Sequence, residues 1–339
     1  MQKTLIALAV AGLATTPACA QSGLIIDGRI DMGVITQDNA QVPETLAQGD
    51  TRRTAVDQGL WTHSRLRFRG TEDLGDGWKA QFWLENRILA DTGNADARQH
   101  WVALTNDDYG TLQLGRVNTP SFDWLMLFDA SGANAFRYVN PAMYDTGESW
   151  ADNAIQYISP VMHGFEVSAY YSKDWLGNED TRSNRSYGGN LRYANGPLHA
   201  LYNVQKYETY SFLASRFPSG TYHTLAGYYD FGVIKLFGTA MYNAYKDKDR
   251  DLSNTKQWSL GFNAPVGTAG TVSLGYGAQS DLRGNGGEER DTVGLTYKHD
   301  LSRRTFGYVG YQWQSPTDRD PATKLRNINT FGTGVVHYF

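Results

Sequence analysis

The chain alternates apolar and polar residues with a period of two along most of its length, and this pattern limits its fold more than any other feature. Near the start, Leu24 and Ile26 alternate with Asp27 and Arg29. Successive side chains of a β-strand point to opposite faces, so such a segment is a strand with one apolar and one polar face. The same alternation recurs at 65–70, 79–88, 165–172, 257–264 and 292–298. The sequence therefore predicts an all-β protein.

Short turns and longer polar segments alternate between these strands. The seven short turns lie at 72–77, 106–110, 162–164, 195–196, 230–232, 267–270 and 302–304. The eight longer connections lie at 36–62, 91–97, 118–152, 176–185, 210–220, 247–255, 283–289 and 317–327. Fifteen connections join sixteen strands, and this alternation is typical of outer-membrane barrels with short periplasmic turns and long extracellular loops. We therefore expect a 16-stranded antiparallel transmembrane β-barrel. A soluble β-sandwich or propeller is the alternative, but it rarely needs so many polar faces.

Composition agrees with a barrel and excludes two other classes. The mean hydropathy is −0.48, and the long uncharged stretch 258–280 is interrupted by Gly, Pro, Ser, Thr and Asn. It is therefore not the run of about 20 mostly apolar residues that a membrane-spanning helix needs. A closed barrel satisfies its backbone groups between strands and needs no such run. The net charge of −4 argues against a nucleic-acid-binding protein.

The first twenty residues have the pattern of a secretory signal peptide. Lys3 precedes the apolar stretch 5–13, and Ala18-Cys19-Ala20 fits a small-residue cleavage site. We expect residues 1–20 to be removed and residues 21–339 to form the barrel. A buried N-terminal strand or helix and a lipoprotein anchored at Cys19 are the alternatives. Cleavage would remove the only cysteine, so no Cys-based metal or redox site is expected.

Two segments carry a resemblance to a known family. Residues 64–85, SRLRFRGTEDLGDGWKAQFWLE, resemble the second strand, turn and third strand of Gram-negative trimeric porins, and residues 109–120, YGTLQLGRVNTP, resemble the entry into their long third loop. With the first strand and the terminal His-Tyr-Phe, the similarity spans essentially the whole chain. It is closest to the branch that includes Neisseria and Comamonas relatives. The resemblance implies a homotrimer in the bacterial outer membrane, in contact with its lipid, with the third loop folded inward.

A barrel of sixteen strands is too wide for its side chains to fill, so it leaves an aqueous channel. The segment 118–152 is the longest connection and is rich in aromatic residues, and connections of this length are usually functional or disordered. The resemblance implies that this segment folds inward and narrows the channel. Its charged residues are candidates for the constriction: Asp123, Asp129, Arg137, Asp145 and Glu148.

Five arginines are candidates for the pore lining. Arg65, Arg67 and Arg69 share one face of a strand, with Arg29 on the preceding strand and Arg116 just before the long loop. The alternative is an ordinary solvated face. Inside a channel, however, fixed positive charge raises the local concentration of anions. Arg65 and Arg116 occupy positions that resemble the basic cluster of the family.

The last strand ends on an aromatic residue. Phe331, Thr333, Val335, His337 and Phe339 alternate along it, and we expect Phe339 to be a structural residue of strand closure or assembly. Aromatic residues at strand ends should also mark the two membrane boundaries. They are Tyr228, Tyr229, Phe231, Tyr242, Tyr245, Tyr338 and Phe339.

The sequence carries no motif for catalysis. It has no His-Glu-x-x-His, no Gly-x-Ser-x-Gly and no phosphate-binding loop, so we predict that it is not an enzyme and needs no cofactor or metal. The predicted function is passive diffusion of small hydrophilic solutes and ions, with a preference for anions. One alternative is a channel selective for a particular small organic solute, stacked on Trp124, Tyr138 or Trp313. Another is an outer-membrane adhesin or hydrolase with a closed lumen.

Overall fold

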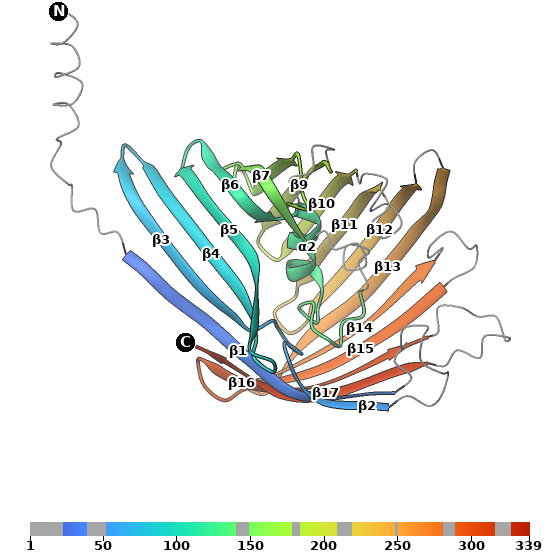
Figure 1. Cartoon of the computed structure of the whole chain (residues 1–339). Helices are drawn as coiled ribbons and strands as arrows, with labels where there is room; N and C mark the ends of the chain where they lie inside the picture. Colours follow the sequence, from blue (N-terminus) through green and yellow to red (C-terminus); the bar gives the residue numbers. More distant parts are fainter. Residues whose placement is uncertain are drawn as a thin grey trace, which may run out of the picture.

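The computed structural model describes residues 23–38, 52–139, 149–177, 184–208, 219–247, 250–280, 289–315 and 327–339. Within these ranges the chain forms antiparallel strands around a central space that contains one helix (Figure 1). The predicted signal peptide lies outside the described residues. None of the described helical residues belongs to a helix long and apolar enough to cross a membrane.

The strands of the described ranges run in chain order around the barrel. Their bounds are β1 (Gly23–Asp38), β2 (Arg52–Gln58), β3 (Arg65–Gly75), β4 (Trp78–Leu89), β5 (Asn94–Asn106), β6 (Gly110–Asn118), β7 (Trp150–Ile158), β8 (Phe165–Ser172), β9 (Ser186–Asn195), β10 (Leu198–Tyr207), β11 (Ser219–Asp230), β12 (Lys235–Asp247), β13 (Arg250–Val266), β14 (Gly270–Ser280), β15 (Glu289–Asp300), β16 (Thr305–Gln314) and β17 (Ile328–Tyr338).

Pairing between the first and last strands closes the barrel. β1 pairs with β17 from Arg29↔Tyr338 to Asp38↔Asn329. The other side of β1 pairs with β2 over residues 32–38 and with β3 over residues 23–29. β2 and β3 are therefore two pieces of one barrel strand, and the described ring has sixteen strands. The predicted strand number, antiparallel order and seven short turns are confirmed.

Three of the predicted long connections are wrong in extent. The prediction placed 36–62 in a loop, whereas β2 lies inside it and pairs with β1. The sequence of β2, RRTAVDQ, is mostly polar, so β2 can be recognised as a strand only from its pairing with β1. The connections predicted at 91–97 and 247–255 are also shorter, because β5 begins at Asn94 and β13 at Arg250. At these ends the strands extend beyond the apolar residues that face lipid, and their polar residues therefore resemble loops in the sequence.

The two faces of the barrel wall differ in polarity. Large apolar side chains are exposed on the outside, and they include Leu84, Val102, Leu114, Leu225, Leu260 and Leu295. Polar side chains are buried on the inside, and they include Asn203, Gln205, Thr224, Gln257, Thr292 and Gln312. This reversal of the polarity of a soluble protein is the pattern of a barrel that faces lipid outside and water inside.

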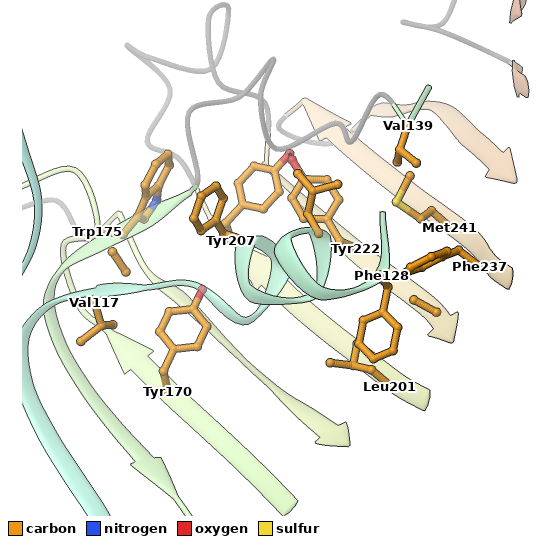
Figure 2. Packing of buried hydrophobic residues seen from close by; sticks show 14 of the residues in the cluster. Val117, Phe128, Val139, Tyr170, Trp175, Leu201, Tyr207, Tyr222, Phe237 and Met241 are labelled. Atoms are coloured by element: carbon orange, nitrogen blue, oxygen red, sulfur yellow. The ribbon is translucent and has the colours of Figure 1, made fainter. Parts of the chain in front are cut away.

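The helix α2 (Pro120–Phe128) lies inside the barrel against β8 to β12 (Figure 1). Pro120 at its first turn has a backbone already set for a helix and lacks an N–H that would have no partner there. Phe122, Leu125 and Phe128 are buried in a cluster with residues of the barrel wall, including Leu201, Tyr207, Tyr222, Phe237 and Met241 (Figure 2). Burial of each large side chain contributes about 1.5–3 kcal/mol. The predicted inward-folded third loop is confirmed.

The aromatic residues expected at the membrane boundaries divide between the two faces. Tyr229 and Phe231 are exposed on the outside, 41% and 56% respectively, as expected. Tyr228 instead contacts Phe128 of α2, with ring centroids 5.7 Å apart, so its assignment to a boundary is wrong. Neighbouring strand residues point to opposite faces, and Tyr228 and Tyr229 cannot share one. The side chain of Tyr245 lies outside the described residues.

We call residues 119–139, which include α2, the inward segment. Beyond the helix, this segment packs against a row of glycines. Phe136 and Tyr138 are fully buried against the inner wall of β13 to β17. A Cβ atom at any of these wall positions would overlap one of the two residues; they are Gly261, Gly275, Gly294, Gly310 and Gly332. We call them the glycine seat. The absence of side chains there allows the segment to approach the wall closely.

Candidate functional site

Strand register brings four of the predicted arginines together on the inner face of β1 and β3. Arg29 is directly opposite Arg65, Arg67 is opposite Asp27, and Arg69 is opposite Ile25. The fifth, Arg116, lies on the inner face of β6, where it bonds Arg98 and Asp152. The inward segment packs against β8 to β17, so the arginines occupy the other part of the wall. This arginine wall and the inward segment border the same lumen.

Glu85 holds two arginines at the middle of this wall. Its side chain is 1% exposed, and its Oε1 lies 3.2 Å from Arg65 Nη1 and 2.7 Å from Arg98 Nε. Hydrogen bonds between charged groups are stronger than neutral ones, and their geometry holds the guanidinium groups in place. Two guanidinium groups share one carboxylate, so the cluster carries a net single positive charge.

Asp27 holds a second pair in the same way. Its carboxylate pairs with Arg67, and its Oδ2 lies 2.8 Å from Arg69 Nε. Arg67 and Arg69 also lie over the ring of Trp83, at 5.1 and 5.8 Å from its centroid. This cluster again has two positive groups for one negative group, two residues further along β3 towards the short turn.

Arg116 belongs to a third group around Trp150. It pairs with Asp152, and its Nε donates to the backbone oxygen of Arg98 at 3.0 Å. The guanidinium groups of Arg98 and Arg116 lie 4.7 and 5.7 Å from the ring centroid of Trp150. Cation–π contacts of this kind attract both guanidinium groups to the face of Trp150.

Arg29 has a different environment. Its Nε donates to the backbone oxygen of His63 at 3.3 Å, and its guanidinium lies 5.8 Å from the ring centroid of Tyr338. Within the described part of the chain it makes no ion pair with an acid.

The predicted loop acids have different surroundings from those expected for a charged rim. Asp129 is buried and accepts hydrogen bonds from Ser131 Oγ at 2.7 Å and from the backbone N–H groups of Ser131 and Ala133. Its carboxylate therefore supports a turn of its own loop. Asp123 accepts from Asn118 Nδ2 at 3.0 Å, and burial raises its pKa to about 6. Asp145 and Glu148 lie outside the described residues.

The backbone of the remaining loop candidate, Arg137, is hydrogen-bonded to the barrel wall. Its carbonyl oxygen accepts a hydrogen bond from Gln312 Nε2 on β16. Its Nη1 lies 3.5 Å from the backbone oxygen of Asn134. At the chain terminus, Phe339 exchanges backbone hydrogen bonds of 3.3 and 3.2 Å with Gly28. The final residue thus extends the pairing of β17 with β1.

Sequence reasoning did not identify the acids that pair with the arginines or the position of Arg98. Asp27 and Glu85 were visible on polar strand faces, but their partners lie on neighbouring strands, and Glu85, which is opposite Arg67 in the register, pairs with Arg65 and Arg98. Asp152 joins them through the pairing of β6 with β7. Arg98 lies at a register shift opposite Glu85 and Asn86, so a strict period of two assigns it to the wrong face.

Asp31 joins the broken strand to the inward segment. Its carboxylate is fully buried and accepts from the N–H groups of Trp61 and Thr62, at 2.7 and 2.8 Å, and from Tyr308 Oη at 2.6 Å. The adjacent Leu60 accepts a hydrogen bond of 2.7 Å from the N–H of Ala135 in the inward segment. We call this set of contacts the Asp31 latch. It holds the segment between β2 and β3 inside the barrel and fixes the tip of the inward segment.

A closed barrel that is apolar outside, charged inside and narrowed by an inward segment defines a transmembrane β-barrel channel. The family model described as Gram-negative porin matches residues 7–319. Outer membrane porin protein 32 of Delftia acidovorans is 35% identical over 327 residues, covering 91% of this chain and 88% of that protein. The chain belongs to the Gram-negative porin family, and it is an outer-membrane channel for passive diffusion.

Further comparisons agree with this assignment. The major outer membrane protein P.IB of Neisseria gonorrhoeae is 25% identical over 348 residues, covering 92% of this chain and 93% of that protein. A solved structure described as an anion-selective porin from Comamonas acidovorans has a TM-score of 0.81 and 28% identity, covering 94% of this chain and 100% of that one. The predicted membership and relationship to the Neisseria and Comamonas branch are confirmed.

Proposed function

We propose that this porin passes small hydrophilic solutes and ions with a preference for anions, and that Arg29, Arg65, Arg67, Arg69 and Arg116 line its permeation path. The observation that supports this most strongly is the ratio of two arginines to one acid around both Glu85 and Asp27. Each cluster keeps one net positive charge that its own wall does not neutralise. In a channel with low-dielectric walls such charge attracts anions and repels cations.

Two further observations support the preference. The description of the Comamonas acidovorans structure calls that protein anion-selective. In the present chain the described loop acids are partly withdrawn from the lumen, because Asp129 supports its own turn and Asp123 is bonded to Asn118. Passive diffusion needs no covalent step, and the proposed permeation path explains the charged groups of the barrel wall. We therefore also infer that the protein is not an enzyme.

The double variant Arg65→Gln/Arg67→Gln tests the preference without leaving a buried acid unpaired. Arg98 still pairs with Glu85, and Arg69 still pairs with Asp27. Each cluster becomes neutral, so we expect the reversal potential in a tenfold salt gradient to move towards the cation side. A perfectly selective channel reaches about 59 mV in such a gradient, and the variant should lose most of the wild-type value.

The control variant removes the same number of positive charges from an exposed turn outside the clusters. Arg303 and Arg304 are exposed in the short turn before β16. We expect Arg303→Gln/Arg304→Gln to keep the wild-type reversal potential, because salt screens exposed charges beyond about 10 Å. An equal shift in both double variants, or none in either, would contradict the assignment of the arginine clusters to the selectivity filter.

We also propose that the protein is a homotrimer. In support, the outer face of β1 and β3 to β6 carries an apolar groove of about 620 Å³. Its lining includes Leu24, Phe82, Val102, Leu104, Leu112 and Leu114. Apolar surface in lipid associates through close packing, which small residues such as Gly70 favour. The mass of the detergent-solubilised protein should be three times that of the chain, and a monomeric mass would contradict the proposal.

A further inference from the structure

A row of aromatic and basic side chains crosses the lumen wall beside the Asp27 cluster. Strand register aligns Ile25, Arg69, Trp83 and Trp101 on four neighbouring strands. The next row towards the short turns contains Thr71 opposite Gln81. These two rows line a cavity of about 310 Å³, which is larger than a single-ring aromatic acid. We call it the Trp83 pocket.

The pocket has an aromatic wall. The rings of Trp83 and Trp101 are nearly parallel, with an interplanar angle of 8° and centroids 5.8 Å apart. This is an offset stack, and because Arg67 and Arg69 also lie over the Trp83 ring, a further ring contacts it edge-to-face. Both tryptophans are only half-buried. Trp101 Nε1 donates to Gln99 at 3.3 Å, whereas Trp83 Nε1 has no hydrogen-bond partner in the described structure.

The pocket also has donors for an anion. Arg69 uses Nε for Asp27, and within the described part of the chain its two terminal nitrogens make no hydrogen bond or ion pair. Its side chain is 41% exposed, so these nitrogens are accessible from the lumen. Gln81 accepts from Thr105 Oγ1 at 2.9 Å through Oε1, which leaves its amide N–H groups as donors. A planar guanidinium with two free donors matches the geometry of a carboxylate.

We propose that the Trp83 pocket is a binding subsite for small aromatic carboxylates inside the channel. The ring of the solute packs against Trp83 and Trp101, and its carboxylate binds the terminal nitrogens of Arg69 and the amide of Gln81. The subsite rests on the proposed function, because a solute reaches it only through the lumen, and the positive clusters bring anions to it. Aliphatic carboxylates such as acetate meet the same charge but gain no aromatic contact.

Block of the chloride current in planar bilayers tests the subsite. Benzoate, cyclohexanecarboxylate and acetate are added separately to wild-type channels in KCl. We expect benzoate to reduce the current with a saturating concentration dependence, and acetate to require up to about tenfold more for the same reduction, since aromatic contacts of a ring are worth up to about one factor of ten. Cyclohexanecarboxylate separates aromatic contact from simple apolar burial and should fall between the two.

Matched variants locate the block. Trp83→Leu should raise the half-blocking benzoate concentration about tenfold, and Trp83→Phe, which keeps a ring, should stay within about threefold of wild type. Trp258→Leu is the control, because Trp258 is 49% exposed on the outer face. Arg69→Gln leaves Arg67 paired with Asp27 and should weaken the block by every carboxylate.

The outcomes separate the subsite from the anion preference. Equal block by benzoate and acetate, or an unchanged half-blocking concentration in both Trp83→Leu and Arg69→Gln, would overturn the subsite while leaving the reversal potential intact. A wild-type channel with a cation-side reversal potential would instead contradict the anion preference. If Trp83→Leu does not assemble, the ratio of the half-blocking concentrations of acetate and benzoate in the wild-type channel decides the question alone.

Discussion

Replacing Gly275 and Gly310 by valine is expected to push the inward segment away from the barrel wall and to increase the single-channel conductance. A side chain at Gly275 overlaps the ring of Tyr138, and one at Gly310 overlaps the ring of Phe136. Both rings are fully buried, so neither has space to retreat while the segment stays in place. Overpacking of this kind costs about 1–3 kcal/mol at each site. Heat-induced unfolding in detergent should therefore begin at a lower temperature.

A control lies on the same strand as Gly310. A Cβ atom at Gly307 would have only one atom within 4 Å, the backbone oxygen of Gly334 at 3.9 Å, so Gly307→Ala should behave as wild type in both measurements. If the double variant does not assemble, Gly310→Ala alone tests the same contact with a smaller side chain. Wild-type conductance together with wild-type thermal stability in Gly310→Ala would show that the glycine seat does not hold the segment.

Asp31→Ala is expected to be the most destabilising single substitution in the lumen. It removes the acceptor for the N–H groups of Trp61 and Thr62 and for the hydroxyl of Tyr308. A buried polar group without a partner costs about 1–3 kcal/mol, and three are affected. Because the latch holds Leu60 against Ala135, the current should also become noisier as the tip of the inward segment loosens.

Tyr308→Phe provides the graded comparison. It removes one of the three hydrogen bonds and leaves both backbone contacts of Asp31. We expect a loss of about 1–3 kcal/mol and little additional current noise. Thermal unfolding in detergent and the variance of the open-channel current measure the two effects. If Asp31→Ala had the same thermal stability and the same variance of the open-channel current as Tyr308→Phe, the proposed role of the Asp31 latch would be contradicted.

The barrel could be predicted because its strands are specified locally. Alternation of polar and apolar residues shows which face of each strand meets lipid, and the short glycine-containing turns show where strands end. Both signals can be recognised without knowing which strands are neighbours. β2 escaped detection because its residues carry a weak alternation, and its strand character depends on pairing with β1. The break before β3 follows from the buried Asp31, thirty residues earlier in the chain, which no local pattern reveals.

The candidate site could be predicted only in part. The arginines of β3 were visible because they repeat every second residue, but the acids that pair with them lie on β1 and β4, and no local pattern shows that these strands flank β3. The acids were therefore sought in the long loop, although Asp27, Glu85 and Asp152 pair with arginines from the barrel wall. The glycine seat was equally hidden, because a glycine in a strand pattern does not show which group approaches it.

The Asp31 latch has a consequence for the order in which the protein matures. Asp31 belongs to the first strand, Tyr308 to the penultimate one, and the glycine seat extends to the last. These partners become neighbours only when the two ends of the chain meet at the seam between β1 and β17. We expect the pore diameter to be set at the end of insertion, so that a precursor with an open seam would be leaky and unselective.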